Sequence, residues 1–454
     1  MCEKNNLFKT FLKYLIPSVS AMWFFSIYTM VDGIFVSRGV GPSALAAVSL
    51  SMPYINAIFA IALSVAVGSS TLISFYLGKN EKEKSNKIFT LNIIILSFIG
   101  FVISLFSFMF LEKISLFLGA TEETLKYTMD YLGIIIIFST FFMLAYSLEV
   151  LIKADGFPIY SIIFVSLAAF TNIILDYIFV IIFNYGVKGA ALATGLSQLI
   201  SFLGFLLHFL GRKSQLKFTK IQLDLKLAKN IFTIGLPEAL TELSAGVTIF
   251  FFNTALLKYL GDRGVTAFGV IIYINNLVMM TMIAINQGIQ PLISFYNGKK
   301  ANKKIESIFK LALGTTITFS IFFIIISQLW TDELVSIFIS SSNTDIYNLS
   351  QDALKIFSFS FALCGFNILI SGYFTALKKI QDALFISIMR GFVLIPILLL
   401  ILPNIIGATG IWLSPVVNEI ITLVFSFNFF LKNKEKGDST FSINKQKSML
   451  SSRA

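Results

Sequence analysis

The sequence predicts an all-α integral membrane protein in which twelve transmembrane helices form two parallel six-helix repeats, an N-lobe and a C-lobe, around a central cleft. Of the 454 residues, 56% are hydrophobic and only 13% are charged. Long apolar runs recur along the chain, and one motif repeats after 220 residues. Soluble domains are about half apolar and about one quarter charged, so this shortage of charge indicates a protein surrounded mostly by lipid.

Apolar runs of at least about 18 residues mark candidate transmembrane helices. Such runs occur twelve times, at 11–36, 48–77, 88–111, 127–152, 159–183, 188–210, 229–257, 265–296, 307–330, 353–377, 382–402 and 407–431. Only Asn184, Tyr185, Gly186 and Lys188 interrupt the stretch from 159 to 210. We therefore interpret that stretch as two helices joined by a short turn.

The basic residues are distributed unequally between the two sides of the predicted membrane. The termini and the loops on their side hold 28 of the 35 Lys and Arg, and the other side holds 7. By the positive-inside rule both termini are expected in the cytoplasm, in a multi-pass protein of the cell (plasma) membrane. The net charge of +11 is then explained by the orientation of the chain in the membrane. No nucleic-acid partner is therefore expected.

An internal repeat divides the spans into two sets of six. The motif at 72–79, LISFYLGK, recurs at 292–299 as LISFYNGK, and the same offset relates Pro17 to Pro237. Since six is even, both repeats enter the membrane in the same orientation and are related by an axis along its normal. The predicted divisions are an N-lobe at 1–210, a cytoplasmic basic linker at 211–228, a C-lobe at 229–431 and a cytoplasmic tail at 432–454, which we expect to be disordered.

Four polar residues of the N-lobe could share one depth in the membrane. At about 1.5 Å per helical residue, Asp32, Asp176 and Thr194 lie roughly 6, 10 and 9 Å from the outer helix ends, and Asn172 is one turn from Asp176 on the same face. Two carboxylates, an amide and a hydroxyl offer ligands for a small cation such as Na⁺, and they suit a proton equally well. The alternative is local: Asp32 caps a helix and Asp176 bonds to Asn172 or Tyr177.

The C-lobe has a second group of candidate residues. A charge at the bilayer centre costs about 2.5–3.5 kcal/mol, so Glu238, Glu242 and Glu419 need an explanation; Glu238 can hydrogen-bond locally after Pro237. We take Glu242, Glu419, Gln287 and Met280 as candidate contacts to substrate or coupling ion. Glu149 lies near the cytoplasmic end, where a side chain can reach water, so no role is expected for it.

Prolines and scarce residue types narrow the function further. Pro17 and Pro237 interrupt the first helix of each lobe and are expected to let it bend, although neighbouring helices can also satisfy the freed groups. The chain has one His, His208, and two Cys, so metal clusters and hydrolytic triads are disfavoured. No phosphate-binding nucleotide loop is present. We expect neither an enzyme nor a cofactor, and place His208 at the interface.

Four motifs resemble the multidrug and toxic compound extrusion (MATE) family: VDGIFV at 31–36, KADGFP at 153–158, NIILD at 172–176 and GVKGAALAT at 186–194. The resemblance covers nearly the whole chain. It implies an antiporter that exports organic cations and other amphipathic drugs in exchange for Na⁺ or H⁺, rocking between outward-open and inward-open states. It also implies a sodium or proton site at Asp32, Asn172, Asp176 and Thr194, and a first helix that bends at Pro17.

One branch of the family has a glutamate about eight residues after the seventh-helix proline, where this chain has Ala245. The main alternative is a lipid-linked oligosaccharide flippase of the same superfamily, which would line its cleft with Arg or Lys. Within the predicted spans Arg390 is almost the only basic residue, which argues against it. The sequence leaves the drug and the choice between sodium and proton open, and a monomer is expected.

Overall fold

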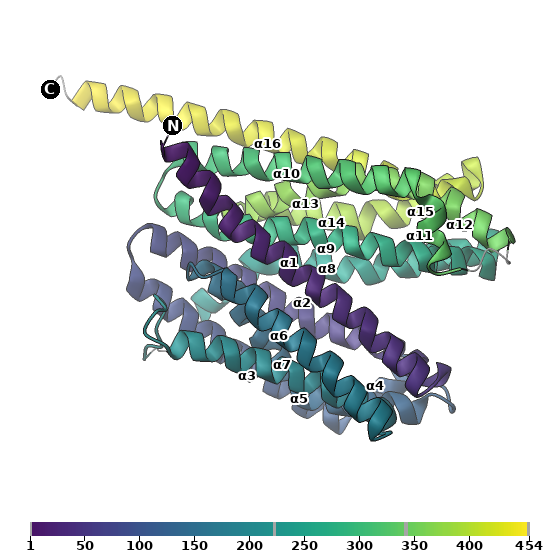
Figure 1. Ribbon diagram of the computed structural model, residues 1–454. Coiled ribbons are helices and arrows are strands. Elements are labelled where there is room, and N and C mark those ends of the chain that lie inside the picture. The colour runs from purple at the N-terminus through teal and green to yellow at the C-terminus, as the bar shows by residue number, and fades with distance from the viewer. Residues whose placement is uncertain (1, 221–223, 340–343, 452–454) are drawn as a thin grey trace.

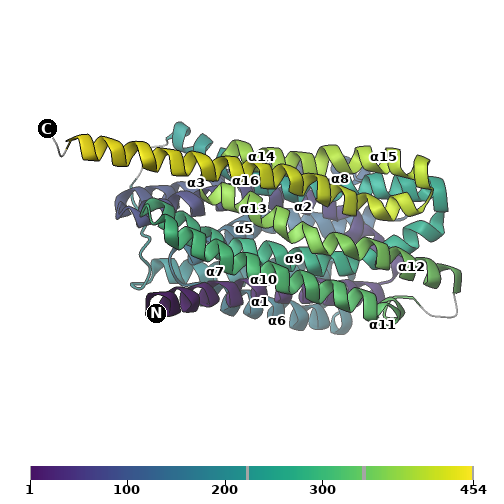
Figure 2. The same cartoon turned by 90° about the horizontal axis from the view of Figure 1, so that it is seen from above.

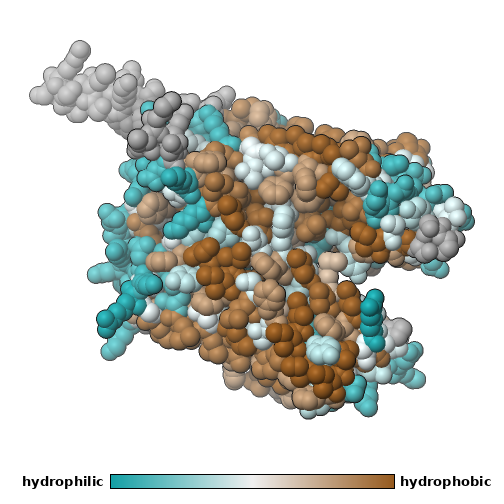
Figure 3. Space-filling view, in the orientation of Figure 1, coloured by the Kyte–Doolittle hydropathy of each residue, from teal (hydrophilic) through white to brown (hydrophobic). Residues whose placement is uncertain are grey.

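The computed structural model describes residues 2–220, 224–339 and 344–451, and these residues form helices joined by short turns, with no strand among them. Within the described residues, twelve helical segments are long and apolar enough to cross a membrane. Figure 3 shows hydrophilic atoms gathered at two opposite ends, with a hydrophobic band between them. The predicted all-α fold of a multi-pass membrane protein is confirmed.

The N-lobe holds the first six spans, which extend past the predicted apolar runs because polar residues continue each helix at its ends. They are α1 (Cys2–Gly39), α2 (Pro42–Gly78), α3 (Lys82–Met109), α5 (Leu125–Ala154), α6 (Ile159–Asp176) with the π-helical η1 (Tyr177–Ile182), and α7 (Gly186–Leu210). The short helix α4 (Leu111–Phe117) precedes α5. Proline at the first position of α2 is compatible with a helix start because that amide needs no partner.

The C-lobe repeats this plan. Its spans are α8 (Leu225–Leu260), α9 (Asp262–Gly298), α10 (Asn302–Leu329), α12 (Thr344–Phe357) with η2 (Ser358–Ser360) and α13 (Phe361–Ala376), α14 (Ile380–Ile388) with the π-helical η3 (Met389–Leu394) and α15 (Ile395–Ile406), and α16 (Thr409–Ser451). The short helix α11 (Thr331–Ser336) begins 220 residues after α4. Helix α16 continues past the predicted span to Ser451, and the disorder of the tail stays a prediction.

Figures 1 and 2 show the two lobes side by side, with both ends of the chain at the same end of the molecule. Helix α2 packs against α5 of its own lobe and against α8 and α9 of the other lobe, and α1 packs against α6 and α9. The first two helices of each lobe therefore build the interface between the lobes.

The repeated motif closes the lobes together at the end that carries the termini. Gly78 on α2 lies against the backbone of Phe295 on α9, and Gly298 on α9 lies against the backbone of Phe75 on α2. A Cβ at either glycine would overlap the carbonyl oxygen of its partner. The Lys378 ammonium, from the turn between α13 and α14, lies 3.3 Å from the centroid of the Phe75 ring.

A second reciprocal contact lies deeper along the same interface. Gly68 on α2 lies against the Ile231 carbonyl of α8, and Gly235 on α8 lies against the Ser64 carbonyl of α2. The Ser64 hydroxyl also donates to the Phe232 carbonyl at 3.0 Å. At the opposite end the lobes part, and Figure 3 shows the surface hollowed between them. The molecule is thus closed at the end of the termini and open at the other.

Two basic residues counted with the loops on the side of the termini are in fact buried within helices. The side chains of Lys153 on α5 and Arg390 on η3 are only 1% and 12% exposed. Each pairs with an acid from the membrane interior, Lys153 with Glu149 and Arg390 with Glu419. The expectation that Arg390 is almost the only basic residue inside the spans is therefore corrected, because Lys153 is also buried within a span.

His208 is also more buried than expected. Its side chain is 5% exposed, and its Nε2 lies 2.9 Å from the Asp155 carboxylate. Asp155 Oδ1 accepts from the backbone amides of Gln215 and Leu216 at 2.8 and 3.1 Å. Instead of facing the interface, His208 belongs to a buried cluster that fixes the start of the linker to the end of α5.

Candidate functional site

Helices α1, α6 and α7 bring together the four N-lobe residues that the sequence singles out. Asp32, Asn172, Asp176 and Thr194 are all buried, with exposures of 6%, 0%, 0% and 7%. The carboxyl groups of Asp32 and Asp176 lie close to each other. Asn172 Nδ2 donates to Thr194 Oγ1 at 3.4 Å. We call these four residues the N-lobe acidic cluster.

The N-lobe acidic cluster has more acceptors than donors. Asp32 Oδ1, both carboxylate oxygens of Asp176 and Asn172 Oδ1 are buried and have no hydrogen-bond partner among the described residues. Tyr177, the alternative partner considered for Asp176, is 53% exposed. Buried acceptors without donors are costly, and two carboxylates in contact need positive charge between them.

These oxygens match the needs of a small hard cation or of a proton shared between carboxylates. In the described part of the chain, no group of three or more His, Cys, Asp or Glu could hold a metal ion. A donor set of two carboxylates, an amide and a hydroxyl suits Na⁺ better than it suits a transition metal, which prefers imidazole or thiolate ligands.

Three further polar residues complete the surroundings of the cluster. Tyr28 and Tyr131 are 4% and 2% exposed, and both lie close enough to Asp32 and Asp176 to feel their charge. Gln198 Nε2 donates to the Tyr28 hydroxyl at 3.2 Å. Tyr28 is one turn before Asp32, and that spacing could have identified it; Tyr131 lies on a different helix, α5, and carries no local signal.

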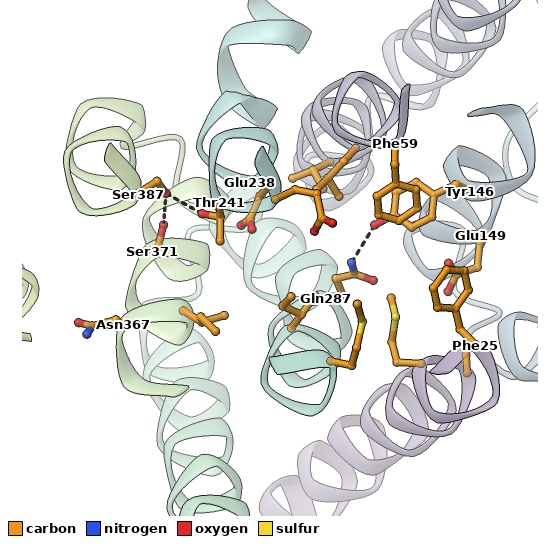
Figure 4. A pocket seen from close by; sticks show the side chains of 18 of the residues that line it. Phe25, Phe59, Tyr146, Glu149, Glu238, Thr241, Gln287, Asn367, Ser371 and Ser387 are labelled. Atoms are coloured by element: carbon orange, nitrogen blue, oxygen red, sulfur yellow. Dashed lines mark hydrogen bonds between the residues drawn. The ribbon is translucent and has the colours of Figure 1, made fainter. Parts of the chain in front are cut away.

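A central cavity of about 60 Å³ lies between the lobes. Figure 4 shows its two sides, with Phe25, Phe59 and Tyr146 facing Thr241, Gln287 and other C-lobe residues. The apolar part of the lining includes Met22, Phe25, Phe59, Leu63, Tyr146, Met280 and Ile283. Of the predicted C-lobe contacts, Glu242, Gln287 and Met280 line this cavity, whereas Glu419 does not.

One acid of the central cavity is already paired. Glu149, to which the sequence analysis assigns no role, is 6% exposed and lines the cavity. Its carboxylate lies 2.8 Å from the Lys153 ammonium and accepts from Ser161 at 2.6 Å. Lys153 also donates to Gln287 Oε1 at 3.4 Å, and Gln287 Nε2 donates to the Tyr146 hydroxyl at 2.9 Å. Since Gln287 belongs to the C-lobe, this network joins the two lobes.

The other two acids of the cavity lie on α8 and differ in their contacts. Glu238 accepts hydrogen bonds from Asn286 at 3.2 Å and from Gln290 at 3.4 Å. Glu242, one turn further along α8, has no hydrogen-bond or ion-pair partner among the described residues. Its carboxylate oxygens are not fully buried. Glu242 is therefore an unpaired carboxylate with access to the cavity.

Two further cavities adjoin the central cavity, one smaller and one larger than it. An N-lobe cavity of about 40 Å³ shares Phe25, Phe59 and Tyr146 with it and extends to Tyr28 and Gln198 beside the acidic cluster. A C-lobe cavity of about 220 Å³ shares Glu242, Met280 and Arg390 with it and also contacts Glu419. The N-lobe cavity therefore links the surroundings of the acidic cluster to the central cavity through shared lining residues.

The prolines do not interrupt their helices. Helix α1 continues through Pro17, and α8 continues through Pro237. The Pro237 carbonyl accepts a hydrogen bond from Thr241 Oγ1 at 2.9 Å. Bending at Pro17 and Pro237 stays a prediction.

Two repeated six-helix lobes, a cavity between them that is closed toward one end, and polar residues buried at membrane depth define a multi-pass membrane transporter. The MatE family model matches the chain twice, at residues 17–178 and at residues 239–400, once in each lobe. The chain therefore belongs to the MATE family, and like the other members it is a transporter and not an enzyme.

Named relatives and solved structures agree with this assignment. The multidrug export protein MepA of Staphylococcus saprophyticus is 27% identical over 422 residues, which are 92% of each chain. An outward-facing multidrug resistance MATE transporter has a TM-score of 0.88 at 22% identity, covering 93% of this chain and 94% of its own. A mutant of the Vibrio cholerae MATE transporter VcmN has a TM-score of 0.89 at 20% identity, covering 96% and 99%. At these identities the structures show a shared fold.

Proposed function

We propose that this chain is a secondary active multidrug efflux antiporter of the cell membrane, which exports cationic and amphipathic compounds in exchange for Na⁺ or H⁺. The observation that carries the proposal is the pair of buried, unpartnered carboxylates at Asp32 and Asp176. Relatives named as multidrug export proteins support the substrate class. We further propose that the chain acts as a monomer, with lipid and small drugs as its partners.

The central cavity supplies the features that a cationic amphiphile requires. Aromatic faces attract cations, and methionine side chains adapt to varied shapes; Phe25, Phe59, Tyr146 and Met280 provide both. Glu242 adds an accessible negative charge without a competing partner. Drug is therefore held by apolar contact and oriented by one carboxylate.

We infer that drug and ion are coupled through the side chains that line the N-lobe cavity, which lies between their two sites. The N-lobe cavity contacts Phe25 and Tyr146 on the side of the drug and Tyr28 and Gln198 on the side of the acidic cluster. Cation binding draws Asp32 and Asp176 together and so moves α1 against α6. If that movement narrows the shared cavity, cation and drug bind in opposition, which is the differential affinity that exchange requires.

The distribution of basic residues supports an orientation for this conformation. The loops at the end of the termini carry most of the Lys and Arg, which favours a cytoplasmic position for that end. Because the reciprocal glycine contacts close the same end, the structure corresponds to an outward-open state of an alternating-access cycle.

The flippase alternative requires unpaired basic groups that could hold a pyrophosphate. Arg390 lines the central cavity but is paired with Glu419, and Lys153 near it is paired with Glu149. Glu238 and Glu242 line the same cavity without a basic partner among the described residues. This surplus of negative charge favours cationic substrates over a lipid-linked pyrophosphate.

The proposal is tested by transport with purified protein in liposomes. Uptake of tetraphenylphosphonium is measured under a sodium gradient alone and under a pH gradient alone, for the wild type and for Asp176→Asn. We expect one of the two gradients to drive uptake by the wild type and neither to drive uptake by Asp176→Asn. The control is Asp130→Asn, which alters a partly exposed carboxylate paired with Lys188. Gradient-driven uptake by Asp176→Asn at the wild-type rate would refute the site.

A further inference from the structure

The C-lobe contains one fully partnered buried carboxylate, Glu419 on α16. Its Oε1 accepts from Arg390 Nε at 2.8 Å and lies 2.7 Å from Arg390 Nη2, and its Oε2 accepts from Asn367 Nδ2 at 2.7 Å. The Glu419 side chain is 6% exposed and the Arg390 side chain 12% exposed. Asn367 is itself held by Ser426, which donates to its amide oxygen at 3.0 Å.

The repeat places this group next to the C-lobe counterpart of the N-lobe acidic cluster. Arg390 lies in η3 of the fifth span of the C-lobe, where the offset that relates Gly186 to Gly407 relates it to Ala169. The motif offset that relates Gly186 to Gly407 relates Gln198 to Glu419. The same offset relates Asn172 to Val393 and Thr194 to Pro415. Arg390 and Glu419 therefore each lie about one helical turn from a counterpart of the cluster.

The two lobes differ in how the negative charge is balanced. In the N-lobe, Asp32, Asn172 and Asp176 present four buried oxygens without a donor. In the C-lobe, both oxygens of Glu419 are occupied, and the positive charge comes from the chain itself. The C-lobe cavity beside the pair, about 220 Å³, leaves the Glu419 and Arg390 side chains with space on one side.

We propose that the Arg390 guanidinium is a built-in cation, which permanently neutralises Glu419 beside the C-lobe counterpart of the cation site and leaves the N-lobe acidic cluster as the single exchangeable site. A guanidinium holds its proton at all accessible pH values, and its tether keeps it next to Glu419 through the cycle. Each transport cycle then exchanges one small cation per chain. Without Arg390, Glu419 becomes a second site for Na⁺ or H⁺.

This inference rests on the proposed function in one respect, since it takes the N-lobe acidic cluster as the exchangeable site. The experiment therefore varies the two lobes independently. Bound cation per chain is counted in purified protein, with ²²Na⁺ if the sodium gradient drives transport or by potentiometric proton titration if the pH gradient does. The variants are Asp176→Asn, Arg390→Gln, the pair of these, and the double variant Arg390→Gln with Glu419→Gln.

We expect one exchangeable cation per chain in the wild type, none in Asp176→Asn, two in Arg390→Gln, and one in Asp176→Asn combined with Arg390→Gln. The last variant isolates the unmasked C-lobe site. If it binds no cation, the built-in cation is refuted. If Asp176→Asn alone still binds one, the N-lobe site of the proposed function is refuted instead.

The double variant Arg390→Gln with Glu419→Gln protects the test against poor folding of the single variant, because it removes both charges and leaves no carboxylate unpaired. We expect it to keep one exchangeable cation per chain, as in the wild type. A loss of that cation would show that the wild-type ion binds in the C-lobe, and would overturn the inference. Arg390→Lys, which keeps the positive charge, is the matched control and should also keep the count at one.

Discussion

At the scale of single residues, the acids of the central cavity differ chiefly in what already neutralises them. Glu149 has Lys153, and Glu238 has two amide donors, whereas Glu242 has no partner among the described residues. At Glu149 and Glu238 a substrate cation would compete with existing protein contacts, whereas at Glu242 it would compete only with water. We therefore expect substrate charge to be recognised most directly at Glu242.

Glu242→Gln is expected to weaken transport of cationic substrates selectively. Hydrogen bonds to charged groups contribute about 1.5–3 kcal/mol, and about 1.4 kcal/mol corresponds to a tenfold change in affinity. We expect the KM for tetraphenylphosphonium to rise about tenfold or more, and that for a neutral amphipathic substrate to change less than about twofold. The control Glu83→Gln alters an exposed carboxylate outside the cavity. Equal effects on both substrates would show that Glu242 does not sense charge.

Lys153 and Glu149 make a second residue-level prediction. Removing one partner of a buried ion pair leaves an uncompensated charge and destabilises proteins by about 3–5 kcal/mol. Lys153→Met is expected to lower the thermal unfolding temperature in detergent, and adding Glu149→Gln is expected to recover most of the loss. If the double variant is no more stable than Lys153→Met, the ion pair is not what stabilises this region.

At the scale of helices, the contact between lobes depends on backbones that approach without side chains between them. Gly68 and Gly78 on α2 face α8 and α9, and Gly235 and Gly298 return the contact. Small residues allow helices in a membrane to approach closely. Because each contact joins opposite lobes, it exists only while that end of the molecule is closed.

Gly78→Ala combined with Gly298→Ala is expected to prevent closure at that end while leaving each lobe folded. The added methyl groups overlap carbonyl oxygens of the opposite lobe. We expect transport to fall at least about tenfold. Accessibility is measured in a parent protein that carries Cys2→Ser, Cys364→Ser and Val67→Cys, which puts one thiol in the central cavity. A thiol reagent applied from the side of the termini should label this thiol faster when Gly78→Ala and Gly298→Ala are added than in the parent alone.

The control for this experiment is Gly314→Ala on α10, where an added Cβ meets no atom within 4 Å. It should transport and label like the parent. Normal transport by the Gly78 and Gly298 double variant would show that the lobes close by another contact.

At the scale of the whole molecule, the features that could be predicted are those that the sequence expresses locally. Apolar runs indicated twelve spans, and the repeated motif indicated two lobes. The motif could not reveal its own role, because the contact between Gly78 and Phe295 joins residues more than 200 positions apart. The N-lobe residues could be grouped from depth alone, since helical rise fixes depth.

What could not be predicted is which buried charges neutralise each other. Lys153 and Glu149 are four residues apart on one helix, and that spacing was a usable signal. Arg390 and Glu419 lie on different helices, and only the packing of η3 against α16 brings them together. The count of unpaired acids in the cavity, and with it the charge of the substrate, therefore depends on tertiary structure.

One exchangeable cation per cycle has a consequence for energetics that involves the entire transporter. A single charge moving through about 150 mV releases about 3.5 kcal/mol, at about 2.3 kcal/mol per 100 mV. At about 1.4 kcal/mol per tenfold, this sustains a gradient of about three-hundredfold for a neutral substrate. For a monovalent cationic drug exchanged one for one, the two charge movements cancel, and only the chemical gradient of the coupling ion remains.

We therefore expect the membrane potential to drive export of a neutral substrate and to leave one-for-one exchange of tetraphenylphosphonium unchanged. The measurement uses liposomes in which potassium and valinomycin set the potential while the sodium and pH gradients are held constant. With two cations per cycle, exchange of the monovalent drug would itself carry one net charge and would respond to the potential. Arg390→Gln, which unmasks a second site at Glu419, should show that response, because its C-lobe lacks the built-in positive charge that keeps the wild type at one ion.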